Sequence, residues 1–237
     1  MQGGQLQISS ADKEVSFKLP FTDPDVSVGG FDSNSKTYGP QSLRVQYDGA
    51  RTRFEVYLNR FSDVPYGHVF YSSVMDLVNR DITQGYGGSV FGENDYISRA
   101  QIAVMLVRAR SDLKPEGMRS DFTDVPAGYW AEGEIAAAKK SGILDGYGDG
   151  TFKPDDYITR AQLSKMVAKA FSIKVDAGNP VIFTDVPSNY WAKEYISDLA
   201  SNQIVGGYGG GLFGPDDPAS RGQFSKYLSN ALNLDTE

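Results

Sequence analysis

The sequence predicts a mainly α-helical protein, built from three helix–loop–helix repeats and preceded by a small β segment. Pentapeptides beginning at Phe61, Phe122 and Phe183 resemble one another, and 122 − 61 and 183 − 122 both equal 61. The same step relates three Gly-Tyr pairs and three arginines: Gly85-Tyr86, Gly146-Tyr147, Gly207-Tyr208, Arg99, Arg160 and Arg221. Units repeated at such a fixed period stack on one another to bury a shared core.

Composition narrows the classes of function. The 237 residues are 40% hydrophobic and 12% aromatic, which is enough for a packed core. A net charge of −7 disfavours binding to nucleic acids or to anionic membrane surfaces. Without cysteine there is no disulfide, thiolate catalysis or cysteine zinc site, and His68 as the only histidine excludes a multi-histidine metal site. No apolar run is long enough to span a membrane.

Residues 1–60 lie outside the repeat and predict a small β-strand region. Alternating residues favour short strands over Gln5–Ile8, Glu14–Leu19, Ser42–Tyr47 and Thr52–Leu58. Asp48-Gly49 is a hairpin signal, and the Gly-, Ser- and Pro-rich stretch Pro20–Pro40 predicts a loop. Met1–Gln5 lacks the features of a signal peptide, so we expect a removed leader or a fragment of a longer protein.

We expect the repeats to occupy residues 61–120, 121–181 and 182–237. In the second copy, a helix over Ala131–Lys140 should end before Gly142. The Gly-rich loop Asp145–Pro154 follows, and an apolar stripe at helical spacing predicts a second helix over Arg160–Phe171. The corresponding stripes of all three copies are the expected core.

The second helix of each copy opens with a capping-box pattern. A Ser or Thr is followed three residues later by Gln, so that each side chain can bond the other residue's amide. These residues are Ser98, Gln101, Thr159, Gln162, Ser220 and Gln223.

The arginine at the first position of each of these helices needs a separate explanation, because the helix dipole disfavours a cation there. One interpretation is an anion site, in which free helix amides and the guanidinium bind a carboxylate. The other is a structural ion pair with an aspartate of the same repeat. The arginines are Arg99, Arg160 and Arg221, and the aspartates are Asp63, Asp124 and Asp185.

Aromatic residues recur beside these groups. Tyr129-Trp130 and Tyr190-Trp191 precede the first helix of copies two and three, and a tyrosine follows glycine in every loop. Exposed aromatic faces beside polar groups favour stacking of sugar rings. Alternatively, each aromatic side chain is simply part of the core.

Residues 122–162 carry four motifs in order: Phe-Thr-Asp-Val-Pro, Tyr-Trp-Ala, the glycine-rich run Gly142–Pro154, and Ile-Thr-Arg-Ala-Gln. Together they resemble the S-layer homology (SLH) domain family, and the resemblance extends over roughly residues 61–234. It implies a pseudo-threefold assembly of three SLH repeats around a central helical bundle, with grooves between neighbouring repeats. It also implies an extracellular, monomeric, non-enzymatic module without cofactor or metal, capable of higher assembly. Such a module would bind secondary cell wall polymers, often ending in pyruvylated N-acetylmannosamine.

The resemblance assigns candidate ligand-binding residues. Its arginines would clamp the pyruvate carboxylate, and its tryptophan would stack on the sugar. Together with the aspartates and the loop Gly-Tyr residues singled out above from the repeat pattern, the full set of candidates is Arg99, Arg160, Arg221, Asp63, Asp124, Asp185, Trp130, Trp191, Tyr86, Tyr147, Tyr208, Gly146 and Gly207. The first copy departs from the pattern, because His68-Val69 stands where the other copies have Tyr-Trp. We therefore expect unequal grooves, with the one that depends on Val69 the weakest.

Three other readings stay open. Asp145, Asp149, Gly150 and Asp156 have part of the spacing of an EF-hand calcium loop, but Tyr147 stands at a ligand position. An enzyme would need a carboxylate pair with a raised pKa, which no motif marks. Alternatively, the repeats are an assembly component of a surface lattice, appendage or virion and use the same fold for protein–protein contacts.

Overall fold

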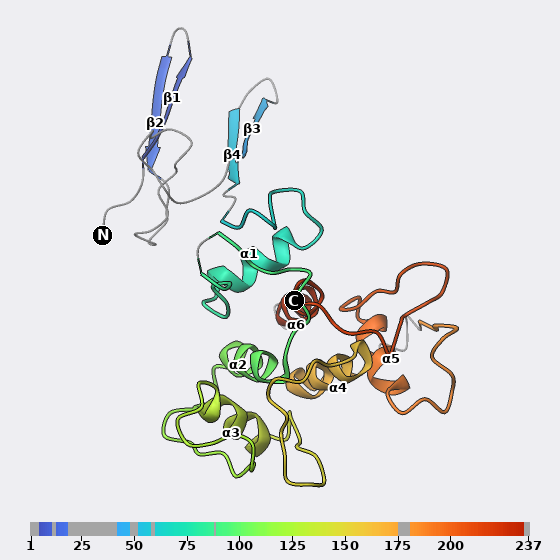
Figure 1. Cartoon of the computed structure of the whole chain (residues 1–237). Coiled ribbons are helices and arrows are strands. Elements are labelled where there is room, and N and C mark those ends of the chain that lie inside the picture. The colour runs from blue at the N-terminus through green and yellow to red at the C-terminus, as the bar shows by residue number, and fades with distance from the viewer. Residues whose placement is uncertain are drawn as a thin grey trace. The chain divides into compact units, whose positions relative to one another are not determined.

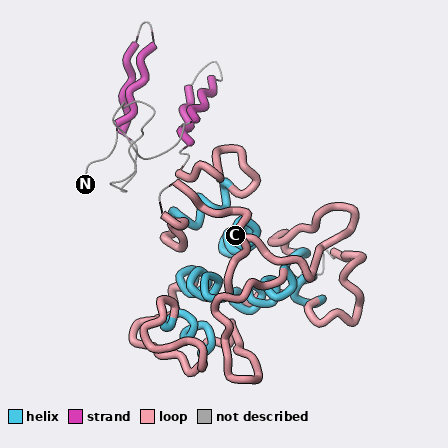
Figure 2. Tube along the Cα trace, viewed as in Figure 1, coloured by secondary structure: helices cyan, strands magenta, loops and turns pink. Residues whose placement is uncertain are grey.

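The computed structural model describes residues 5–10, 13–18, 42–47, 52–57, 60–87, 89–174 and 181–234. They divide into two compact units. The first comprises Met1–Tyr71 and Gln84–Gly92, and the second comprises Ser72–Thr83 and Glu93–Glu237. In Figure 2 the helices appear as cyan segments joined by long pink loops, which is the alternation expected of helix–loop–helix repeats.

The first unit contains two separate two-stranded antiparallel sheets. Strand β1 (Gln5–Ser10) pairs with β2 (Lys13–Lys18), and β3 (Ser42–Tyr47) pairs with β4 (Thr52–Tyr57). The four expected strands are confirmed, with small differences at their ends. The expected loop Pro20–Pro40 and the turn at Asp48-Gly49 lie outside the described residues.

Within residues 60–234, the described part contains six helices, two in each repeat. They are α1 (Tyr71–Asn79), α2 (Arg99–Ala109), α3 (Glu132–Lys140), α4 (Arg160–Phe171), α5 (Lys193–Ser201) and α6 (Arg221–Leu234). The bounds of α4 agree with the expectation, and α3 begins one residue later than expected because Ala131 is its N-cap. The mainly α-helical class is therefore confirmed.

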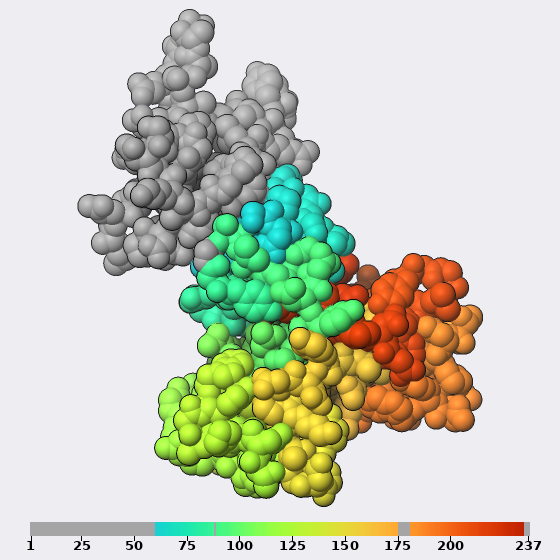
Figure 3. Space-filling view, in the orientation of Figure 1, coloured from blue at the N-terminus to red at the C-terminus, as the bar shows by residue number. Residues whose placement is uncertain are grey.

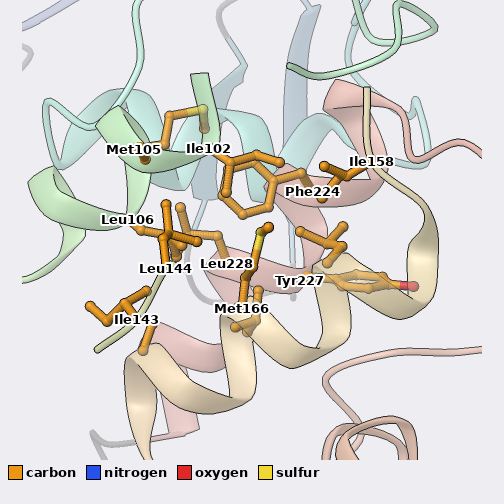
Figure 4. Packing of buried hydrophobic residues seen from close by; sticks show 14 of the residues in the cluster. Ile102, Met105, Leu106, Ile143, Leu144, Ile158, Met166, Phe224, Tyr227 and Leu228 are labelled. Atoms are coloured by element: carbon orange, nitrogen blue, oxygen red, sulfur yellow. The ribbon is translucent and has the colours of Figure 1, made fainter. Parts of the chain in front are cut away.

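The core lies where α2, α4 and α6 meet. Their apolar faces supply buried side chains to one continuous cluster. Figure 4 shows residues from all three helices converging: Ile102, Met105, Leu106, Met166, Phe224, Tyr227 and Leu228. This arrangement confirms the central helical bundle. None of the helices in the described part of the chain is long and apolar enough to cross a membrane.

The first helix of a repeat packs on the second helix of the preceding one. Helix α3 packs against α2, and α5 against α4, as Figure 1 shows. The same relation joins the ends of the array, because the Ser229 hydroxyl on α6 donates to the Asp76 carboxylate on α1 at 2.7 Å. Each packed lobe therefore combines residues of two successive repeats.

Backbone hydrogen bonds close the three repeats into a ring. The amide of Arg99 donates to the carbonyl oxygen of Asp156 at 3.0 Å. The equivalent bonds run from Arg160 to Asp217 and from Arg221 to Asp95, both at 2.9 Å. The last of these connects the third repeat to the first, so the pseudo-threefold arrangement is complete.

Candidate binding site

The capping boxes form as expected at the starts of α2, α4 and α6. At α4 the Gln162 amide donates to the Thr159 hydroxyl at 3.3 Å, and the Gln162 side chain accepts from the Thr159 amide at 3.0 Å. The amides of Arg160 and Ala161 donate to carbonyl oxygens of the third repeat. The expectation of free helix amides is therefore wrong, because these amides hold neighbouring repeats together.

The arginine side chains also bridge successive repeats. Arg99 is 5% exposed, and its Nε and Nη2 donate to the carbonyl oxygens of Phe152 (2.7 Å) and Asp145 (2.9 Å). Arg160, 2% exposed, donates in the same way to Phe213 and Gly206, both at 2.9 Å. This bridging accounts for a cation at the first helical position.

Aromatic rings cover these guanidinium groups. The Cζ atom of Arg99 lies 5.0 Å from the ring centre of Tyr147 and 4.5 Å from that of Phe152. Such cation–π contacts add to the carbonyl bonds. Burial lowers the pKa of Arg99, while nearby Tyr147 and three aspartates oppose this. The loop tyrosine and the arginine thus lie side by side. The same contact occurs one repeat later, where the Cζ atom of Arg160 lies 4.6 Å from the ring centre of Tyr208.

The aspartates organise the loops of their own repeats. The Asp124 carboxylate accepts from the amides of Phe152 (2.8 Å) and Lys153 (2.7 Å). Arg160 therefore bonds carbonyl oxygens of the third repeat instead of forming the expected ion pair with Asp124. Asp185 and Asp63 each accept from the corresponding pair of loop amides.

The glycines before the loop tyrosines are required by close packing. A Cβ added to Gly146 would lie 2.8 Å from the carbonyl oxygen of Thr151 and would collide with the ring of Phe122. A Cβ on Gly207 would collide with the carbonyl oxygen of Leu212. Both glycines therefore allow the loop to lie on the Phe residue that begins its repeat.

A pocket of about 180 Å³ lies beside Arg99 in the second unit. It brings together four of the expected residues, Arg99, Gly146, Tyr147 and Trp191. Helix α4 adds three that the sequence reasoning missed, Gln162, Lys165 and Met166. A signal for Lys165 was present in the sequence, because Lys226 repeats it at the 61-residue step. In Figure 3 the second repeat, which forms most of this pocket, runs from green to yellow.

The pocket has two cationic side chains and an exposed aromatic ring. Among the described residues Lys165 has no ion-pair partner, whereas Asp145 is paired with Lys169 at 3.3 Å. Trp191 is 54% exposed. The ring of Tyr190 lies 5.9 Å from that of Trp191, and the Tyr190 hydroxyl donates to Asp216 at 2.7 Å. Burial and this carboxylate raise the pKa of Tyr190 to about 12.

The remaining expected residues are placed as follows. Trp130 and Tyr208 are exposed in the second unit, and Tyr86 is exposed in the first. Arg221 is buried at the start of α6. Val69 is 67% exposed, and the neighbouring His68 accepts from the Phe70 amide at 3.3 Å. Ligand binding by these residues stays a prediction.

Two of the three carboxylates of the calcium alternative have other partners. Asp149 accepts from the Thr151 amide at 3.0 Å, and Asp145 pairs with Lys169. Across the residues placed by the structure, no three His, Cys, Asp or Glu side chains are grouped to hold a metal ion.

The model of the S-layer homology domain family matches the chain at residues 60–103, 121–164 and 182–225. Three relatives illustrate the range of proteins to which the chain is similar. S-layer protein EA1 of Bacillus anthracis is 28% identical over 171 residues, which cover 71% of this chain and 20% of the relative. The surface-layer 125 kDa protein of Lysinibacillus sphaericus is 30% identical over 168 residues, covering 69% of this chain and 14% of the relative.

The third relative is an enzyme. An amylopullulanase of Thermoanaerobacterium thermosulfurigenes is 28% identical over 161 residues, covering 66% of this chain and 8% of the relative. The chain thus spans a fifth or less of the length of these three relatives, of which one is named as an enzyme and two are named as surface-layer proteins. The three tandem matches cover more than half of the sequence. The chain therefore belongs to the S-layer homology domain family.

Proposed function

We propose that the three repeats bind an acidic polysaccharide of the bacterial cell wall and so anchor an attached protein outside the cell. The observation that carries this proposal is the pocket in which Arg99 and Lys165 lie near the exposed ring of Trp191. A sugar ring can lay its apolar face on the indole while its hydroxyl groups bond polar side chains. The two cations favour a carboxylate substituent on that sugar.

Three of the expected residues have separate parts in the proposed site. The Asp124 carboxylate fixes the loop, and Gly146 allows the loop to pack closely. A guanidinium has five N–H groups, and the carbonyl oxygens of Phe152 and Asp145 accept from two N–H groups of Arg99. Other N–H groups of Arg99 can therefore bind a ligand in the pocket that it lines.

The family resemblance refines the ligand to a polymer ending in a pyruvylated sugar. A pyruvate ketal carries one carboxylate, whose negative charge is opposite to the positive charges of Arg99 and Lys165. The relatives support an anchoring module without catalysis of its own, because the matched part occurs both in proteins named for the surface layer and in an amylopullulanase. We propose a single chain as the binding unit, since its three repeats close their own ring.

Sedimentation with cell-wall sacculi tests this function. The protein should sediment with sacculi that carry their secondary polymer and stay in solution with stripped sacculi. Lys165→Ala should weaken binding about tenfold, because a charge-assisted contact contributes about 1.5–3 kcal/mol. Lys140→Ala removes an equal charge from the exposed end of α3 and should leave binding unchanged.

The assembly alternative gives a different result in the same experiment. Two relatives are named as surface-layer proteins, which is compatible with repeats that contact other protein copies. Under that alternative, sedimentation would not depend on the polymer. Equal binding to intact and stripped sacculi would therefore contradict the proposed function.

A further inference from the structure

The three segments that precede α2, α4 and α6 are bonded to one another. The Ile97 amide donates to the Ala219 carbonyl oxygen at 3.1 Å, and the Ala219 amide donates to the Ile158 carbonyl oxygen at 2.9 Å. An antiparallel bridge between Ser98 and Tyr157 joins the first segment to the second. The side chains of Ile97, Ile158 and Ala219 are buried, and Ile158 appears in Figure 4 among the core residues. The three segments therefore meet in one place at the edge of the core.

Two tyrosines are exposed at this junction. Tyr96 is 51% exposed and Tyr157 is 62% exposed. Their ring centres lie 5.6 Å apart in an edge-to-face arrangement. Pro218, which is also exposed, has the same position in the third repeat, because it follows Tyr157 by 61 residues. Neither tyrosine lines the pocket beside Arg99, so the proposed function leaves this pair of rings unexplained.

An exposed aspartate precedes each of these residues. Consecutive Cα atoms are about 3.8 Å apart, so each aspartate lies close to the ring or the proline that follows it. Among the described residues, none of the three aspartates is in an ion pair. Arg99 lies near Asp156 but donates to carbonyl oxygens instead. We call the six residues the junction face: Asp95, Tyr96, Asp156, Tyr157, Asp217 and Pro218.

The charge of the junction face restricts its partners. Its carboxylates repel an acidic polysaccharide, so this face is unsuited to the polymer proposed above. Repulsion also disfavours a second copy of this chain, because each copy has a net charge of −7. An arginine matches both components of the face, since a planar guanidinium stacks on a tyrosine ring and bonds a carboxylate through two N–H groups. Lysine is a compact point charge and matches this combination less well.

We propose that the junction face binds a basic segment of another protein. An arginine of that segment stacks on Tyr96 and Tyr157, and its guanidinium pairs with the adjacent carboxylates of Asp95 and Asp156. None of the six residues lines the pocket beside Arg99, so this surface goes beyond the proposed function in both its place and its class of ligand. One chain can therefore hold an acidic polymer in the pocket and a basic protein at the junction.

Calorimetry with a short soluble peptide of alternating glycine and arginine tests this binding on the full chain. Peptides in which lysine or glutamate replaces arginine test the preference for a guanidinium. Tyr157→Ala removes one exposed ring, and Tyr86→Ala, which removes an exposed ring in the first unit, is its control. Asp95→Asn combined with Asp156→Asn removes two charges from the face. Glu116→Gln combined with Glu194→Gln removes two exposed charges elsewhere and is the second control.

We expect the arginine peptide to bind more tightly than the lysine peptide and the glutamate peptide not to bind. Tyr157→Ala should lower affinity for the arginine peptide about three- to tenfold, and the paired aspartate substitution should lower it about tenfold or more. Both controls should bind as the unmodified protein does. Melting temperatures should stay unchanged in all four variants, because the substituted side chains are exposed.

Equal affinity of Tyr157→Ala and the unmodified protein would overturn the inference. Equal losses in the controls would also overturn it, since they would assign binding to the overall negative charge. Soluble fragments of chitosan, a cationic polysaccharide, are the competing ligand. If they bound more tightly than the arginine peptide and depended on the same residues, an amino sugar would replace the basic protein as the partner and overturn the inference.

Sedimentation with sacculi separates this inference from the proposed function. Tyr157→Ala should sediment with polymer-bearing sacculi as the unmodified protein does, because Tyr157 lies outside the pocket beside Arg99. Loss of sedimentation in this variant alone would assign the ring to polymer binding and overturn the inference. Failure of the unmodified protein to sediment would contradict the proposed function, whereas peptide binding at the junction face would still support the inference.

Discussion

The backbone amide of Arg221 donates a 2.9 Å hydrogen bond to the carbonyl oxygen of Asp95, and this bond joins the third repeat to the first. The Ser229 hydroxyl reinforces the closure by donating to Asp76 at 2.7 Å. Because every lobe contains residues of two repeats, no repeat can unfold without exposing the core of its neighbour.

We therefore expect the repeats to unfold in one cooperative step. Ser229→Ala should lower the free energy of unfolding by about 1–2 kcal/mol and shift the whole transition in calorimetry. Ser225→Ala is a matched control, because the Ser225 hydroxyl bonds only within its own helix, to the Arg221 carbonyl. Its effect should be smaller. Separate transitions for the individual repeats would contradict the closed ring.

Arg99 should be important for stability as well as for binding. Arg99→Ala leaves the carbonyl oxygens of Phe152 and Asp145 without their donors and removes two cation–π contacts. We expect the free energy of unfolding, measured in urea, to fall by about 2–4 kcal/mol. Arg108 on the exposed face of the same helix makes one longer bond, at 3.4 Å to the Ile82 carbonyl oxygen, so Arg108→Ala should cost about 1 kcal/mol or less. Similar stabilities of the two variants would show that the bridging bonds contribute little.

Gly146 and Gly148 provide a test of loop packing. Gly146→Ala should lower the free energy of unfolding by about 1–3 kcal/mol or more, because the new Cβ meets the Thr151 carbonyl and the Phe122 ring. The Cβ atom that Gly148→Ala adds has no other atom within 4 Å, so this substitution should change the free energy of unfolding little. Thermal unfolding of both variants checks the difference. If Gly146→Ala were as stable as the unmodified protein, the close approach of loop and Phe122 would be refuted.

Acid should destabilise the third loop through Asp185. Burial alone would raise the pKa of Asp185, but hydrogen bonds from the amides of Gly214 and Phe213 outweigh it and hold the pKa below its ordinary value. The carboxylate therefore stabilises the fold above about pH 4 and loses this contribution as the pH falls further.

Asp185→Asn tests this dependence, because its amide cannot accept both loop hydrogen bonds with the same strength. Its melting temperature should be about 2–4 °C lower at pH 7 and should decrease less on acidification below pH 4. Parallel curves of melting temperature against pH for the variant and the unmodified protein would contradict this assignment.

Trp191 should report directly on ligand binding. Trp130→Phe leaves Trp191 as the only tryptophan, and its ring is 54% exposed beside the pocket. Polymer that covers this ring should shift its fluorescence emission to shorter wavelength. An unchanged emission at polymer concentrations that saturate binding would show that the sugar lies elsewhere.

The local structure was predictable from the pattern of residues along the chain. The 61-residue period, the capping box at Thr159 and Gln162 and the apolar stripe of α4 were sufficient to predict the helices and their order. These features depend on contacts between residues close in the chain, which spacing reveals directly. The same motifs were sufficient to identify the family and to select Arg99, Tyr147 and Trp191, which meet at one pocket.

Which repeat a side chain contacts became clear only from the packing of the repeats on one another. The sequence alone suggested that Arg160 would bind an anion or pair with Asp124, whereas it holds the loop of the next repeat through carbonyl oxygens. Backbone carbonyls are present at every position, so no residue pattern marks the ones that act as acceptors. Lys165 acquires its significance for the same reason, because only the packing of one repeat on another brings its side chain into a pocket with Arg99 from a different helix.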